Sequence, residues 1–215
     1  ELADVVVAAG PERSAQRNRG LALATGELVG FIDSDMYLTS RVAAQVDAAF
    51  ATGDPDGVIV AEHSCGEGFL AACRAHEKRL YIGNADVEAA RFFRTASVRA
   101  IGGYREELRA GEDWELADRF EAAGHRIGRI EALIWHDDGR ISLTEVFAKK
   151  WYYGRSFADY LAVRPPNGTR RLTRPGVLTE PARLLRHPLL TAGLLVLKAV
   201  ETTGLCLGVI RARRG

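Results

Sequence analysis

Short apolar runs alternate with stretches of helical periodicity along most of this chain. Runs of strand length occupy residues 5–9, 28–32, 58–60 and 127–135, and residues 91–95 also look extended. Helices are expected between these runs, at residues 14–25, from about residue 40, at 69–80, at 112–123 and at 143–153. The helix that begins at about residue 40 has Val42, Val46 and Phe50 on one face. This alternation predicts an α/β fold built around a sheet.

Turn-forming residues and a change in composition divide the chain. Ser14 is placed to cap the first helix and Gly26 to end it. The stretch Arg164-Pro165-Pro166-Asn167-Gly168 is typical of a linker. We therefore expect a folded body of residues 1–163 and a C-terminal tail of residues 164–215.

The body and the tail differ in charge. Residues 1–163 carry 19 basic and 26 acidic side chains, whereas residues 164–215 carry 10 basic and 2 acidic ones. A basic tail favours an anionic surface as its partner. Because the tail has no aromatic side chains on which bases could stack, a membrane surface fits it better than nucleic acid does.

The tail contains two apolar runs, residues 189–197 and 204–210, separated by a segment with Lys198 and Glu201. Together they reach the about 20 residues that a membrane span needs. Both charges would lie mid-span, however, where each costs roughly 2.5–3.5 kcal/mol. We favour an amphipathic segment lying at the membrane interface; the alternatives are a true span and a helix packed on a soluble body.

Cysteine use bears on the compartment. Cys65, Cys73 and Cys206 match no zinc-binding spacing, and no secretory leader is visible. Reduced thiols are typical of the cytosol. Together with the tail, this predicts a cytoplasmic protein attached peripherally to the inner face of the cell membrane.

The first candidate site is Asp33-Ser34-Asp35, which directly follows the apolar run Leu28-Val29-Gly30-Phe31-Ile32. Two carboxylates at the end of a buried strand are costly unless a cation holds them. Hard oxygen ligands suit Mg²⁺ and Mn²⁺, so the pattern indicates a divalent metal bound to a diphosphate.

Two further acidic or titratable positions fall at the ends of elements. Glu112-Asp113 opens a helix after Gly111, where carboxylates interact well with the helix dipole, and one of them is a candidate general base. His136 follows the apolar run 127–135 and has two interpretations, a structural hydrogen-bonding residue or a ligand of Mn²⁺ or Mg²⁺.

Basic residues supply the remaining candidates. Arg17-Asn18 lies on the helix before the Asp33 strand and is either a solvated helix face or a neighbour of the nucleotide and metal loop. Lys149-Lys150 is followed by Trp151-Tyr152-Tyr153, and this combination suits a diphosphate leaving group, sugar stacking, or packing on the sheet.

Taken in order, these stretches resemble the family 2 glycosyltransferases of the GT-A fold. The motifs that carry the resemblance span about 140 residues. They are Gln16-Arg17-Asn18-Arg19-Gly20 continuing to Gly26-Glu27, Phe31-Ile32-Asp33-Ser34-Asp35, Ile101-Gly102-Gly103-Tyr104, Gly111-Glu112-Asp113-Trp114-Glu115-Leu116, His136 with Ser142-Leu143, and Lys150-Trp151-Tyr152-Tyr153-Gly154. The resemblance implies a Rossmann-like mixed sheet flanked by helices, with the basic, apolar helical tail appended.

The resemblance also implies roles for single residues. Asp113 matches the catalytic base of an inverting transfer. Asp35 and His136 match the ligands of a Mn²⁺ or Mg²⁺ ion. The substrate- and nucleotide-binding set implied by the match is Arg17, Asn18, Asp33, Glu112, Trp114 and Lys150.

The function implied is metal-dependent, inverting transfer of a sugar from a nucleotide-sugar to a hydroxyl of a glycan or lipid-linked acceptor. Family members begin with a strand, a helix and a second strand that hold the nucleotide base, and we expect this chain to lack them before Val5. One alternative is a nucleotidyltransferase that makes sugar nucleotides. Another is a non-catalytic, membrane-associated module that retains the fold.

Overall fold

The computed structural model describes residues 3–163 and 181–213. Its centre is a five-stranded mixed sheet with the order β1-β4-β3-β5-β2. The β3–β5 pair is parallel and the other three neighbouring pairs are antiparallel. The strands are β1 (Leu28–Gly30), β2 (Met36–Leu38), β3 (Gly57–Glu67), β4 (Ala90–Arg94) and β5 (Ile127–Arg140). The predicted α/β architecture with a mixed sheet is confirmed.

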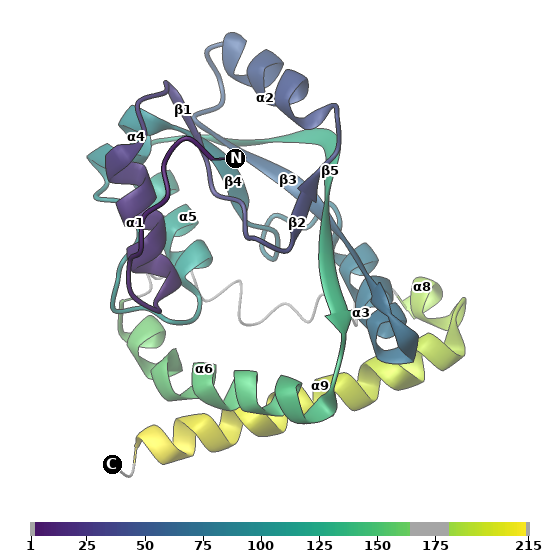
Figure 1. The fold of residues 1–215 in the computed structure, drawn as a ribbon. Coiled ribbons are helices and arrows are strands. Elements are labelled where there is room, and N and C mark those ends of the chain that lie inside the picture. The colour runs from purple at the N-terminus through teal and green to yellow at the C-terminus, as the bar shows by residue number, and fades with distance from the viewer. Residues whose placement is uncertain (1–2, 164–180, 214–215) are drawn as a thin grey trace.

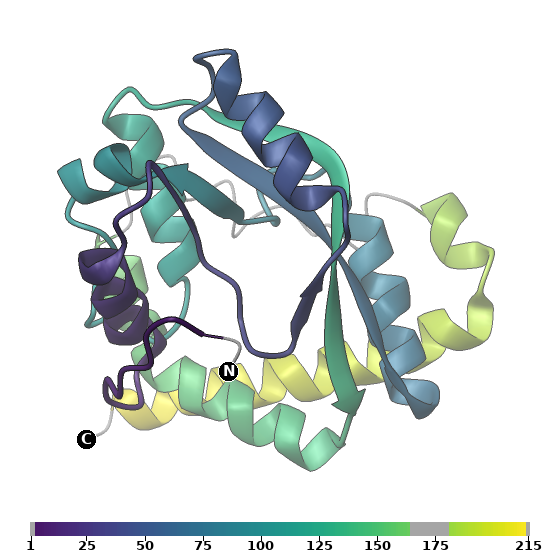
Figure 2. The same cartoon turned by 45° about the horizontal axis from the view of Figure 1, so that its top comes forward.

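Helices cover the sheet and extend beyond one end of it, as Figures 1 and 2 show. Helix α2 lies over one face, α1, α4 and α5 gather on the other side, and α6 and α9 run side by side below the sheet. The helices are α1 (Arg13–Leu23), α2 (Val42–Ala51), α3 (Gly68–Tyr81), α4 (Thr95–Ala100), α5 (Glu112–Ala122), α6 (Leu143–Val163), α8 (Pro181–Leu185) and α9 (Pro188–Ala212).

Two hydrophobic clusters fix the helices on the sheet. The apolar face predicted for α2, Val42, Val46 and Phe50, is fully buried against β3 and β5. On the other face, Phe93 and Phe120 pack edge to face among residues of α1, α4 and α5. Because β3 is covered on both faces, its first five residues are all buried.

Several predicted boundaries are wrong. Residues 5–9 form no strand, and Val6 is 84% exposed, since no neighbouring strand of the described chain pairs with them. Ser14 does not cap α1: it lies inside the helix, where its hydroxyl donates to the carbonyl of Leu108 at 3.1 Å. His136 does not follow β5 but lies within it, because β5 pairs with β2 and β3 beyond that point.

The tail contributes one long helix that packs on the body. By length and composition, helix α9 is apolar enough to cross a membrane. An 18-residue segment of it has a mean hydropathy of 1.7, and a third of that segment is buried inside the protein. It contacts α6 and α3 along its length. The predicted linker at residues 164–168 lies outside the described residues, so the division of the chain at residue 163 stays a prediction.

Candidate functional site

The two aspartates lie on a turn between β1 and β2. The turn is closed by the backbone N–H of Met36, which donates to the carbonyl of Asp33 at 3.0 Å. Strand β2 then pairs with β5, with Met36 opposite His136. The pairing register therefore brings Asp35 to His136, and the Asp35 Oδ2 and His136 Nε2 atoms are 3.3 Å apart.

A carboxylate from β3 lies on the other side of the imidazole. Glu62 Oε2 is 3.4 Å from His136 Nδ1 and accepts a hydrogen bond from Lys78 at 2.8 Å. Its Oε1 accepts from Arg91 on β4. The hydrogen bond to Glu62 raises the pKa of His136. Burial would raise the pKa of Glu62, but the hydrogen bond with His136 and the charges of Arg91 and Lys78 outweigh burial and lower it.

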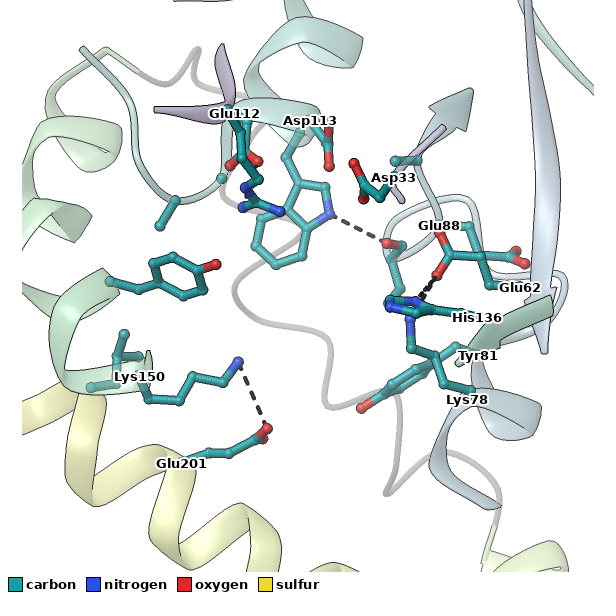
Figure 3. A pocket seen from close by; sticks show the side chains of 18 of the residues that line it. Asp33, Glu62, Lys78, Tyr81, Glu88, Glu112, Asp113, His136, Lys150 and Glu201 are labelled. Carbon is teal, nitrogen blue, oxygen red and sulfur yellow. Dashed lines mark hydrogen bonds and ion pairs between the residues drawn. The ribbon is translucent and has the colours of Figure 1, made fainter. Parts of the chain in front are cut away.

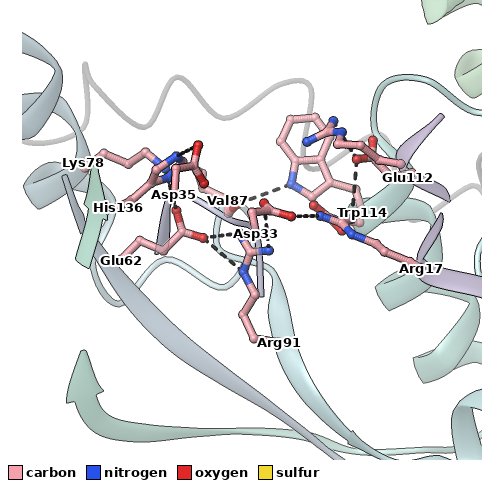
Figure 4. Close-up of polar contacts among 12 residues, drawn as sticks. Arg17, Asp33, Asp35, Glu62, Lys78, Val87, Arg91, Glu112, Trp114 and His136 are labelled. Atoms are coloured by element: carbon pink, nitrogen blue, oxygen red, sulfur yellow. Dashed lines mark hydrogen bonds and ion pairs between the residues drawn. The ribbon is translucent and has the colours of Figure 1, made fainter. Parts of the chain in front are cut away.

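Arginines join this group to the opening of α5, as Figure 4 shows. Arg17 donates to Asp113 at 2.6 Å and to Asp33 at 3.0 Å, and Arg91 lies 3.6 Å from Asp33. Burial would raise the pKa of Asp33, but the two guanidinium groups lower it. The result is an alternating series of carboxylates and cations, in which each buried charge faces an opposite one.

The start of α5 depends on a glycine. Gly111 has a φ of +76°, and a side chain there would come within 2.8 Å of the Tyr160 ring. This conformation directs Glu112 and Asp113 into the site. Glu112 is almost fully buried and pairs with Arg13 at 2.8 Å. Burial and the adjacent Asp113 charge raise the pKa of Glu112.

These residues line a cavity of about 580 Å³ (Figure 3). Asp33, Asp113 and His136 lie on its walls, and the aromatic side chains of Trp114 and Tyr153 add apolar surface. Among the described residues, its lining includes five lysines or arginines and six carboxylates. Such a cavity has the size and the mixed polar and aromatic character of a small-molecule site.

The far wall of the cavity comes from α6 and α9. Lys150 lies opposite Glu112 and Asp113 in Figure 3, with its Nζ 3.7 Å from a carboxylate oxygen of Glu201. Burial lowers the pKa of Lys150. Lys198 also reaches this wall, so the tail takes part in forming the cavity.

Most of the predicted site residues are brought together. Asp33, Glu112, Asp113, Trp114, His136 and Lys150 all line the cavity, and Asp35 lies beside His136 with 51% of its side chain exposed. Arg17 lies behind Asp33 and Asp113 and stacks over Tyr104. The proposed binding roles of these residues stay predictions.

Asn18 is placed differently. Its side-chain amide donates to the carbonyl of Tyr104 at 2.8 Å and its Oδ1 accepts from the N–H of Tyr104 at 2.8 Å. It also donates to Glu106 and is absent from the lining of the cavity. Its observed contacts join α1 to the turn at residues 101–104.

Sequence reasoning missed Glu62 and Arg91. Both are charged residues in strands whose neighbours are buried, and Arg91 itself is 6% exposed. A charge inside an apolar strand is the signal that could have identified them, since such a charge needs a partner. It could not have named the partner, which depends on the order of the strands.

The donor set can be compared with the requirements of a divalent metal. Among residues 3–163 and 181–213, no cluster of three or more His, Cys, Asp or Glu side chains has metal-binding geometry. The pair Asp35 and His136 nonetheless fits Mg²⁺ or Mn²⁺: neighbouring ligands of an octahedral ion lie about 3 Å apart, and Mg²⁺ usually takes one or two protein ligands together with substrate phosphates and water. Glu62 on the second imidazole nitrogen would orient the ring.

The sequence is similar to two curated proteins of Mycobacterium tuberculosis, from strains CDC 1551 / Oshkosh and H37Rv, both named pre-mycofactocin glycosyltransferase. Each is 34% identical over 182 residues, which cover 76% of this chain and 37% of the relative. The chain thus spans just over a third of the length of these relatives. No family model matches it.

Two solved structures of S. aureus TarS are distantly similar. Residues 1–349 of TarS in complex with UDP-GlcNAc align with a TM-score of 0.44 and 16% identity, covering 96% of this chain and 73% of TarS 1–349. A second TarS structure has the same TM-score and identity, and its alignment covers 94% of this chain and 42% of that TarS chain. A TM-score below 0.5 does not establish a shared fold.

Proposed function

We propose that this chain is part of a glycosyltransferase that moves a sugar from a nucleotide-sugar to an acceptor hydroxyl. The observation that carries the proposal is the joint placement of Asp33, Asp113 and His136 on one cavity, with Asp35 beside the imidazole. The 34% identity to proteins named glycosyltransferases supports it. We assign the chain to family 2 and the GT-A fold on its motifs.

In this mechanism Asp113 removes the proton from the acceptor hydroxyl. The acceptor oxygen forms its bond to the anomeric carbon on the face opposite the nucleotide diphosphate, and the bond to the diphosphate breaks, so that the configuration inverts. Arg17 holds the Asp113 carboxylate in position through its 2.6 Å contact. The Trp114 and Tyr153 rings provide apolar surface for the sugar.

Asp35 and His136 would hold a Mn²⁺ or Mg²⁺ ion, which when bound neutralises the departing diphosphate. Asp33 would contact the nucleotide beside this pair. Lys150 reaches the cavity from the opposite wall and offers a further cation to the diphosphate.

The acceptor in this proposal is a glycan or a lipid-linked molecule, and the protein acts in the cytoplasm at the inner face of the cell membrane. The nucleotidyltransferase alternative shares an acidic metal site but transfers a nucleotidyl group. The non-catalytic alternative retains the cavity without turnover. The nucleotidyltransferase alternative does not account for the similarity to proteins named glycosyltransferases. The non-catalytic alternative does account for it, and the binding titration separates that alternative from the proposal.

Titration of the full-length protein with UDP, GDP and TDP tests the proposal. We expect one nucleoside diphosphate to bind in the presence of Mn²⁺ and to bind at least about tenfold more weakly after chelation, because six carboxylates line the cavity. Asp35→Asn should reproduce the effect of the chelator. Absence of metal-dependent binding to all three would overturn the enzyme proposal.

A further inference from the structure

Helix α9 has an unusual distribution of charge. From Pro188 to Ile210 it carries two charged residues, Lys198 and Glu201. The Glu201 side chain is buried, and the Lys198 side chain is only 33% exposed. Every exposed position in that stretch is uncharged. These exposed positions are Pro188, Leu189, Ala192, Leu195, Val196, Ala199, Thr202, Thr203, Cys206, Leu207 and Ile210. A surface helix of a soluble body has the opposite arrangement.

The inward charges are neutralised by the body. Glu201 accepts from Arg74 of α3 at 2.6 Å and from Lys198 at 2.7 Å, and Lys198 also pairs with Glu77. The two charges that would be costly in a membrane are therefore sequestered on the protein side of the helix.

Arginines flank the uncharged face. Arg183 and Arg186 precede α9, and Arg211 and Arg213 lie at its end, all exposed. This arrangement of an apolar face between basic ends complements the apolar interior and negative headgroups of an anionic membrane.

The packing of α9 against α6 favours a position of α9 at the membrane interface over a position across the membrane. Gly208 of α9 lies against Gly154 of α6, where an added Cβ would be 2.9 Å from the Gly154 Cα atom. Because α6 is bound closely to α9, a membrane-spanning α9 would carry α6 with it. Exposed charged residues of α6, Glu145, Lys149 and Arg155, would then enter the bilayer.

We propose that the uncharged outward face of α9 lies in the interface of an anionic membrane, parallel to its surface. The edge of this face also borders the cavity, since Thr202 is exposed and Thr202 and Leu205 line the cavity. An acceptor carried by a lipid would then reach Asp113 from the membrane side. This last step rests on the proposed glycosyltransferase function; the membrane contact does not.

Vesicle flotation tests the contact. We expect the full-length protein to float with vesicles of phosphatidylcholine and phosphatidylglycerol and much less with phosphatidylcholine alone. The double variant Leu195→Asp/Leu207→Asp alters residues that are 56% and 46% exposed, and should bind at least about tenfold more weakly. Leu23→Asp, at a 44% exposed position of α1, is the matched control and should bind like the unmodified protein.

Three results would overturn the proposal. The first is no binding to the anionic vesicles, or equal binding by the double variant when its circular dichroism is unchanged. The second is that the unmodified protein forms a dimer and does not bind vesicles, while the double variant is monomeric. This result would make the face a contact between two copies of the chain. The third is resistance to alkaline carbonate extraction from cell membranes, which would indicate a span. Nucleoside diphosphate binding, measured separately, reports on the glycosyltransferase proposal alone.

Discussion

At the scale of single residues, the site is defined by the pairing of its carboxylates with particular arginines. Arg17 contacts both Asp33 and Asp113, and so links the turn after β1 to the start of α5. A carboxylate fixed in this way has one defined position relative to a bound acceptor, which general-base catalysis requires. The adjacent Glu112 pairs with Arg13 at 2.8 Å and lies 3.6 Å from the same Arg17.

Asp113→Asn should leave nucleoside diphosphate binding intact and lower sugar transfer about 100-fold or more, because the amide cannot take up the acceptor proton. The measurement is the release of sugar from a nucleotide-sugar that carries the nucleoside diphosphate found to bind in the titration. Glu121→Gln, an exposed change on the same helix, is the control and should retain full turnover. Turnover by Asp113→Asn equal to that of the control would contradict the assignment of the base.

Residues of this kind show the limits of prediction from sequence. Asp33, Asp113 and His136 could be proposed because each follows or opens a recognisable element. Glu62 and Arg91 were missed because their importance comes from pairing with each other and with His136 and Asp33. These contacts join strands 29 or more positions apart in sequence, and no local pattern specifies them.

At the scale of elements, the α6–α9 contact depends on glycine. Gly154, Gly204 and Gly208 let the two backbones approach closely, and at Gly208 an added Cβ would collide with the Trp151 carbonyl oxygen. The sequence pattern of α9 indicated only an apolar segment interrupted by two charges. Its partner helices and its role in the cavity follow from this close packing.

Gly208→Ala should lower the free energy of unfolding by roughly 1–3 kcal/mol, since the backbone of α6 has no room to move away cheaply. Gly20→Ala is the matched control: Gly20 lies within α1, and nothing is within 4 Å of an added Cβ. That variant should be about 0.5–1 kcal/mol more stable. Urea unfolding of both variants provides the comparison, and equal effects would show that the helix contact is looser than described.

At the scale of the whole molecule, one charged cluster connects α3, α6 and α9. Glu201 lies within 4 Å of Arg74, Lys150 and Lys198. Burial would raise the pKa of Glu201, but these three cations outweigh it and lower the pKa to about 2. The folded state therefore favours the ionised carboxylate more strongly than the unfolded state does.

The free energy of unfolding should consequently depend on pH in the acid range. The lowered pKa of Glu201 contributes stability that is fully present above the unfolded value of 4.5 and is lost as the pH falls towards about 2. Glu201→Gln should cost on the order of 3 kcal/mol at neutral pH. The difference from the unmodified protein should shrink over this acid range, as followed by urea unfolding at a series of pH values. A difference that stayed constant with pH would contradict this account.

The sequence by itself determined the local features of this protein. It specified the α/β alternation, the buried face of α2, and the positions of Asp33 after a strand and of Asp113 at the start of a helix, because periodicity and element ends are encoded by neighbouring residues. It did not specify the position of His136, which lies within β5. The tertiary structure alone decided the extent of β3 and β5 and the partners of the buried charges. It also decided that Lys198 and Glu201 turn inward on α9. Each of these depends on contacts between distant segments, whose energy no single segment contains.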